Sequence, residues 1–250
     1  ISLMLDYALG GRSDNLYTFH RTSLTLHLAN ASLIAVLLYL LFGKPFIAAA
    51  VALLFGLHPL TVEPVCWVGD RKTLLAAFFS FWSLVLYVRY TQKNRSTFVI
   101  AALLIYLLAL MSKPTSTPLP ALMLLMDFWP LRRLRWWAVW EKLPLFLLGG
   151  VFSIITCVSQ KSSSGPVLSA IPHPGAILLH SCYNIIFYLS KIVWPVKLSS
   201  YYSFPEPLAL SNPVVLSSVI ATCILIPLLV FSLRRTRAPL TGFLLFFVAL

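Results

Sequence analysis

The chain has 250 residues, of which 59% are hydrophobic and only 10% are charged. Soluble domains carry about a quarter charged residues, so this composition excludes an ordinary soluble domain and indicates an integral membrane protein. The net charge of +12 would point to nucleic acid in a soluble protein, but the basic residues stand in short connections between apolar runs. There they act as topology signals, so we expect a lipid bilayer and no nucleic acid as partner.

The apolar runs predict the fold class. Stretches of the ~20 residues needed to cross a bilayer recur along the chain without the alternation of a membrane barrel. We therefore predict an all-α, polytopic transmembrane helical bundle that forms one domain over residues 1–250. Because the chain begins at Ile1 and stops at Leu250 within an apolar run, we expect this domain to be truncated at both ends. The cysteines show no metal-ligand spacing, so no metal site is predicted from them.

The expected crossings follow one another with short polar connections. They are predicted at residues 19–42, 46–60, 73–90, 97–111, 143–159 and 214–233, with a further one beginning at Leu240. The sequence from His58 to Lys72, HPLTVEPVCWVGDRK, separates the second crossing from the third and gathers polar side chains between apolar runs. An unpaired charge in hydrocarbon costs several kcal/mol, so this segment is predicted to be a polar loop at a membrane surface.

Two segments depart from simple crossings. Closely spaced prolines in SKPTSTPLP remove backbone donors, so a broken helix is predicted near residues 113–128. Further along, a parity argument applies to residues 143–233. Basic residues near 142 and 234 should share one side of the membrane, yet three apolar segments lie between them. Three crossings would put these residues on opposite sides, so one of the three segments is predicted not to cross. The segment near 175–194 carries a polar stripe at helical spacing and is predicted to be an interfacial helix.

Basic connections set the predicted orientation, because Lys and Arg near the ends of spans favour the cytoplasmic side. The connections are marked by Arg89, Lys93 and Arg95, by Arg132, Arg133, Arg135 and Lys142, and by Arg234, Arg235 and Arg237. Counting back from them places residues 1–18 and 61–72 on the extracytoplasmic face.

The polar segment contains the main candidate binding residues. Adjacent Arg71 and Lys72 suit a phosphate, since Arg offers a bidentate fork and Lys a point charge. The alternative is that both cations anchor the next helix in lipid phosphate. His58 and Glu63 are placed to bond each other or an acceptor sugar, and the alternative for His58 is a cap at the helix end.

Two further candidates lie outside the polar segment. His20 begins a polar stripe with Ser23, His27 and Asn30 on one face of the first predicted crossing. We expect Asn30 to hold helices together and His20 to line a cavity. Lys113, at the end of the fourth crossing, is expected to reach the same site, with snorkelling towards lipid phosphate as the alternative.

Four stretches of the sequence carry a family resemblance: HPLTVEPVCWVGDRKTLLAAFF, MSKPTSTPLPALMLLMDFWPLRR, EKLPLF and YLSKIVWPVKLSSYYSFP. In this order they resemble the membrane half of the transmembrane and tetratricopeptide-repeat O-mannosyltransferases and their bacterial relatives, which have the GT-C fold. The resemblance implies a GT-C-like bundle in the bacterial inner membrane or the endoplasmic reticulum. It matches the family at His58, Glu63, Trp67, Arg71, Lys72 and Lys113. It departs from the family at Thr61, Asp70, Thr73 and Ser23, where His, Gly, an acid and Asn are common.

The resemblance implies an enzyme that transfers a sugar, mannose or similar, from a polyprenyl-phosphate carrier to a protein hydroxyl on the extracytoplasmic face. The catalytic acid of such an enzyme is expected upstream of Ile1, and a divalent cation is left open as cofactor. Two functions of other classes also fit the residues. One is a transporter or flippase of polyprenyl-linked glycans, and the other is a non-catalytic membrane scaffold.

Overall fold

The computed structural model describes residues 1–12, 14–163, 174–199 and 201–249, and these described residues contain helices and no strand. The helical prediction is therefore confirmed. The chain forms two compact units, residues 1–156 and residues 157–250. The predicted single domain over 1–250 stays a prediction.

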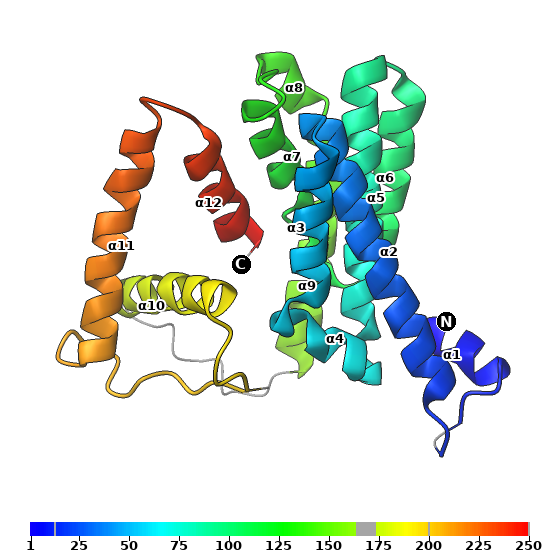
Figure 1. The fold of residues 1–250 in the computed structure, drawn as a ribbon, viewed down its shortest axis with the longest axis horizontal. Coiled ribbons are helices and arrows are strands. Elements are labelled where there is room, and N and C mark those ends of the chain that lie inside the picture. Colours follow the sequence, from blue (N-terminus) through cyan, green and yellow to red (C-terminus); the bar gives the residue numbers. More distant parts are fainter. Residues whose placement is uncertain (13, 164–173, 200, 250) are drawn as a thin grey trace. The chain divides into compact units, whose positions relative to one another are not determined.

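The first unit contains the helices α1 to α8 and most of α9 (Figure 1). Their bounds are α1 Ser2–Ala8, α2 Tyr17–Phe42, α3 Pro45–Leu57, α4 Val62–Cys66, α5 Arg71–Lys93, α6 Ser96–Ser112, α7 Leu119–Phe128, α8 Trp136–Trp140 and α9 Leu143–Ser163. The long helices begin and end within a few residues of the predicted crossings. Gly43 and Asn94 end α2 and α5 in the left-handed backbone conformation, at φ 67° and 51°. Glycine and asparagine accept this conformation most readily, which explains both stops.

Helix α5 is the centre of the first unit and packs against both α2 and α6. Its buried side chains join those of its neighbours in one apolar core, which contains Leu33, Leu37, Leu84, Val85, Tyr87, Val88, Tyr106, Leu110, Met123 and Leu145. Figure 1 shows α1 and α4 near one end of these helices and α8 near the other end. The unit therefore has two polar ends separated by apolar helices.

Five helical stretches are long and apolar enough to cross a membrane, namely residues 17–42, 68–93, 136–160, 175–193 and 213–232. Helix α3 and the segment Pro59–Cys66 pass the same criterion together, although they are bent by 57°. The described residues thus contain up to six candidate spans if the bent pair counts as one.

The polar segment differs from the loop that was predicted. Residues 58–72 form a 3-10 turn at Pro59–Thr61, then α4, and then a second 3-10 turn at Val68–Asp70 that leads into α5. Prolines at the first positions of such turns have the backbone angle that helical turns need. The segment is therefore an ordered chain of short helices and not an irregular connection.

The region of the prolines is interrupted between α6 and α7. Lys113 is extended, Pro114–Ser116 form a 3-10 turn, and α7 begins at Leu119. This geometry agrees with an interruption near the start of residues 113–128. That α6 and α7 are the halves of one broken helix stays a prediction.

The second unit contains α10 Pro174–Val193, α11 Pro213–Ser232 and α12 Ala238–Ala249. Helix α10 packs on α11 and lies across it in Figure 1, where the two helices are labelled. Helix α10 is also long and apolar enough to cross a membrane, so its interfacial placement stays a prediction. Residues 164–173, which precede α10, lie outside the described residues.

Candidate functional site

The predicted site residues share one end of the first unit. Helices α2 and α5 begin at this end, whereas α3 and α6 finish there, because successive long helices run in opposite directions. His20 and Arg71 lie in the first turns of α2 and α5, while His58 and Lys113 cap the last turns of α3 and α6. Glu63 lies between them on α4. Residues that are up to 93 positions apart in sequence (20 to 113) therefore lie at the same end of the first unit.

Arg71 is the most deeply buried member of the group, with 2% of its surface exposed. Its guanidinium pairs with Asp6, donates to the Phe19 carbonyl at 2.6 Å and lies 3.4 Å from the Ser23 hydroxyl. Thr22 donates to the other Asp6 oxygen at 2.8 Å. Arg71 therefore joins α1, α2 and α5, and its nitrogen atoms are already used inside the protein.

Lys113 forms a second polar cluster at the start of α5. Its Nζ donates to the Thr73 hydroxyl at 2.6 Å and lies 3.5 Å from an Asp70 carboxylate oxygen, and Thr73 in turn donates to Asp70 at 2.8 Å. The resembled family has an acid at position 73 and glycine at position 70. Here the carboxylate that faces Lys113 comes from Asp70, one helical turn earlier. Lys113 keeps 28% of its side-chain surface exposed, so it is held in place without being enclosed.

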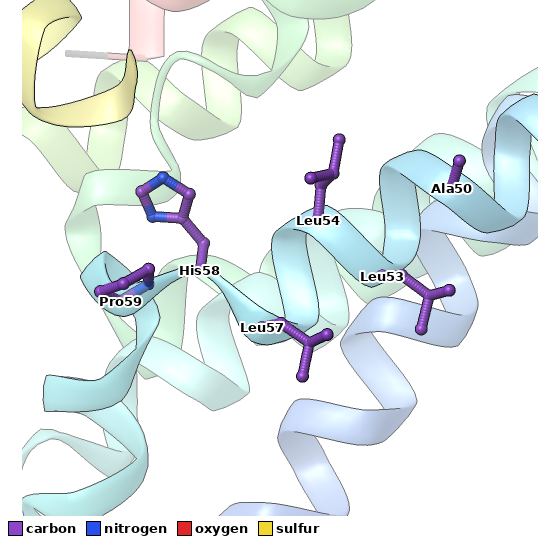
Figure 2. A pocket seen from close by; sticks show the side chains of 6 residues that line it. All are labelled: Ala50, Leu53, Leu54, Leu57, His58 and Pro59. Atoms are coloured by element: carbon purple, nitrogen blue, oxygen red, sulfur yellow. The ribbon is translucent and has the colours of Figure 1, made fainter. Parts of the chain in front are cut away.

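His58 ends α3 and borders a cavity. Its Nδ1 accepts a hydrogen bond from the Leu60 amide at 3.2 Å, so the side chain caps the 3-10 turn Pro59–Thr61 that follows α3. The carbonyl of His58 accepts a 2.7 Å bond from Thr61, where the resembled family has a second histidine. A cavity of about 540 Å3 extends from His58 along α3, as Figure 2 shows. Its other lining residues are Ala50, Leu53, Leu54, Leu57 and Pro59.

The remaining predicted residues are exposed. Glu63 and Lys72 both lie on the surface. His20 is also exposed and borders a cavity of about 350 Å3 between the start of α2 and the end of α4, which agrees with the cavity role expected for it. Arg21 and Cys66 contribute to the same cavity.

The geometry of the acids bears on the divalent cation left open by the resemblance. Among the described residues there is no group of three or more His, Cys, Asp or Glu side chains arranged to hold a metal ion. Asp6 and Asp70 each face a cation instead. The described residues therefore do not by themselves fit a bound divalent cation.

The polar stripe of α2 holds helices together. His27 lies 2.9 Å from the Gly56 carbonyl of α3, and the Asn30 amide donates to the Leu74 carbonyl of α5 at 3.1 Å. The role predicted for Asn30 is confirmed. Its Oδ1 has no hydrogen-bond partner within the described part of the chain.

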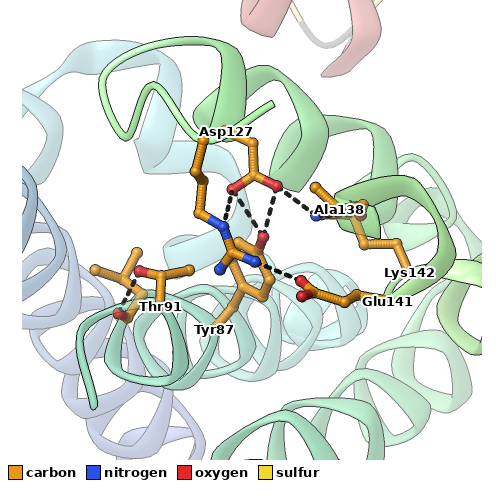
Figure 3. A network of polar contacts seen from close by, with 8 residues as sticks. Tyr87, Thr91, Asp127, Ala138, Glu141 and Lys142 are labelled. Carbon is orange, nitrogen blue, oxygen red and sulfur yellow. Dashed lines mark hydrogen bonds and ion pairs between the residues drawn. The ribbon is translucent and has the colours of Figure 1, made fainter. Parts of the chain in front are cut away.

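A second polar network lies at the opposite end of the unit, around Asp127 (Figure 3). The Tyr87 hydroxyl lies 2.8 and 2.7 Å from the two Asp127 carboxylate oxygens, and Lys142 reaches the same carboxylate at 2.5 Å. All three residues are completely buried. Asp127 therefore has a structural role. Lys142, which was counted among the basic residues that mark the connections, is an internal partner of Asp127.

Arg133 extends this network to the surface. It lies 3.9 Å from Asp127 and donates to Glu141 at 2.5 Å. Burial lowers the pKa of Arg133, but the neighbouring Tyr87, Asp127 and Glu141 offset this effect, so the pKa lies above its usual value. Arg133 consequently stays positively charged, and it links the buried Asp127 to the more exposed Glu141.

Asp6 was not among the predicted site residues, although residues 1–18 were predicted to lie on the extracytoplasmic face. The signal available in the sequence was a carboxylate in an apolar turn, SLMLDYA, close to the first crossing. Such a residue needs a cation when it is buried. The sequence could not show that Arg71 is this cation, because the two residues are 65 positions apart and only the fold brings them together.

These features define a class of protein. The chain is a multi-pass helical membrane protein with a polar cluster at one end of its first unit. Comparison with protein-family models, curated proteins and solved structures finds no match.

Proposed function

We propose that the chain is the membrane part of a GT-C-like glycosyltransferase. It transfers a sugar, mannose or similar, from a polyprenyl-phosphate donor to a protein hydroxyl on the extracytoplasmic face. Residues 113–128 then form the broken helix of such an enzyme, and residues 175–194 form its interfacial helix. The observation that carries the proposal is that Lys72, Lys113, His58 and Glu63 all lie at the same end of the apolar helices. The resemblance in sequence supplies the reaction.

The structure separates the cations that are available to a donor phosphate from those that are not. Arg71 is enclosed and already bonded to Asp6, Phe19 and Ser23. Lys72 is exposed, and Lys113 is held by Thr73 with part of its side chain open. We therefore assign the phosphate contact to Lys72 and Lys113, and we assign Arg71 to holding α5 in position. Lysine binds phosphate well as a point charge.

In the transfer, the bond from the sugar to the phosphate oxygen breaks while the acceptor hydroxyl forms the new bond. Polyprenyl phosphate leaves with the electron pair, and a base removes the hydroxyl proton. Glu63 shares its short segment with Lys72, which places it on the side of the leaving phosphate. A general base must reach the attacking hydroxyl within hydrogen-bond distance on the other side. We therefore assign Glu63 to orienting the donor and not to removing the proton.

The test measures donor binding and sugar transfer on the full chain in nanodiscs, with polyprenyl-phosphate mannose as donor. Lys72→Gln should weaken donor binding about ten- to a hundred-fold, the size of one charge-assisted hydrogen bond. Lys44→Gln is the matched control, since Lys44 is exposed in the connection between α2 and α3 at the other end. Unchanged affinity in Lys72→Gln would leave this cation as a lipid anchor. Donor binding without any transfer to a hydroxyl would favour a carrier of polyprenyl-linked glycans.

A further inference from the structure

The stretch of residues 127–142, from the end of α7 to the start of α9, has an unbalanced charge. Its two acids, Asp127 and Glu141, are paired with Lys142 and Arg133 inside the network of Figure 3. Arg132 and Arg135 are exposed, and neither has an ion pair within the described residues. The local acids are therefore already used, and two guanidinium groups three positions apart carry positive charge on the surface.

Three tryptophans stand directly beside these arginines. Trp136, Trp137 and Trp140 of α8 are 71%, 75% and 52% exposed. An exposed set of indoles costs free energy in water because apolar surface is hydrated. Indole rings are instead favoured between lipid head groups and acyl chains.

The segment is held firmly on its inner side. Ala138 is buried at 2% exposure, and its carbonyl accepts a 2.8 Å bond from the buried Lys142. The amides of Leu131 and Arg133 donate to the carbonyls of Met126 and Asp127 at 3.0 and 2.9 Å. The arginines and tryptophans are thus presented outward by an ordered backbone, so binding a ligand requires no ordering of the chain.

The position of the segment selects the ligand. Helix α8 leads into α9, and residues 136–160 together are long and apolar enough to cross a membrane. The tryptophans and arginines therefore stand at one end of a candidate span, at the depth of the head groups. We propose that residues 132–140 bind an anionic phospholipid, whose phosphate contacts Arg132 and Arg135 while its upper acyl chains lie against the tryptophans.

The two arginines predict how strongly the segment should prefer an anionic lipid over a neutral one. Each Lys or Arg near an anionic membrane surface contributes about 1 kcal/mol, so two of them favour an anionic lipid over a neutral one by about thirty-fold. This preference does not depend on the proposed glycosyltransferase reaction, because the site lies at the opposite end of the first unit from Lys72 and Lys113.

The test uses the full chain in nanodiscs made of equal amounts of phosphatidylcholine and phosphatidylglycerol, with bromine atoms on the acyl chains of one lipid at a time. Bromine quenches tryptophan fluorescence on contact. Brominated phosphatidylglycerol should quench the protein more strongly than brominated phosphatidylcholine. Arg132→Gln/Arg135→Gln should remove this difference, because both charges that select the head group are gone.

The matched control is Lys93→Gln/Arg95→Gln, which removes the same charge from two exposed positions, the last residue of α5 and the residue before α6, with no tryptophan near them in sequence. It should keep the preference for phosphatidylglycerol. Equal quenching by both lipids in the unaltered protein would overturn the proposal. A preference that survives in Arg132→Gln/Arg135→Gln would also overturn it, because other residues would then select the anionic head group.

Discussion

At the scale of single residues, burial decides the role of each cation. Arg71 and Lys72 are neighbours in sequence and both carry a positive charge, yet Arg71 is 2% exposed and Lys72 lies on the surface. Successive residues of a helix point about 100° apart, so one faces α1 and α2 while the other faces outward. The pair therefore divides into a structural arginine and an available lysine.

The Asp6–Arg71 pair predicts a large effect on stability. Asp6→Asn leaves the Arg71 charge buried without its counter-ion, which costs about 3–5 kcal/mol in the free energy of unfolding. The measurement is reversible unfolding in mixed micelles. Asp14→Asn is the control, because Asp14 is an exposed acid in the same part of the chain. If both variants unfolded like the unaltered protein, the ion pair would not contribute to holding α1.

At the scale of elements, the Asp127 network adds polar bonds between helices that already share the apolar core of the first unit. Tyr87 belongs to α5, Asp127 to α7, and Lys142 directly precedes α9. Lys142 also lies 4.8 Å from the centre of the Tyr87 ring. The three side chains form a fully enclosed set in which each charge has a partner, so the network is a joint between helices.

Breaking this joint from one side should destabilise the first unit. Lys142→Met removes the cation and leaves the Asp127 carboxylate buried, at a cost of about 3–5 kcal/mol in the free energy of unfolding. Asp127→Asn/Lys142→Met should recover a large part of this loss, since no charge then remains inside. Lys93→Met, at an exposed position near the end of α5, should change stability little. A double variant as unstable as Lys142→Met alone would contradict the role of the charge pair.

Helix positions were predictable from the sequence because apolar runs and their polar stops are local signals. The ends of α2, α5 and α11 lie within three residues of their predicted positions, and prolines and polar turns mark these limits. The short helices of residues 59–70 were not predicted, since each is too short to show a period. The partners of Arg71 and Lys142 were not predicted either. They lie 65 and 15 residues away, and only packing brings them together.

At the scale of the whole molecule, basic connections predict which end of each helix faces the cytoplasm. The burial of Lys142 and the pairing of Arg133 remove two of the charges counted for the connection before α9. Arg132 and Arg135 remain exposed there, and the exposed Lys93 and Arg95 still mark the connection after α5. The predicted orientation therefore rests on fewer charges than the sequence suggested. The charges that remain exposed are all positive, so the predicted cytoplasmic side of these connections does not change.

Labelling of single cysteines tests this orientation. In a background without the native cysteines, Val62→Cys, Gln160→Cys and Ser203→Cys should react with a membrane-impermeant maleimide in intact cells, because the basic connections predict an extracytoplasmic position for all three. Gln92→Cys should react only after the membrane is opened. All four positions are exposed, so access to the reagent depends on the side of the membrane. Gln160 and Ser203 stand before and after α10. If these two positions reacted from opposite sides, α10 would cross the bilayer, since an interfacial helix returns the chain to the side from which it came.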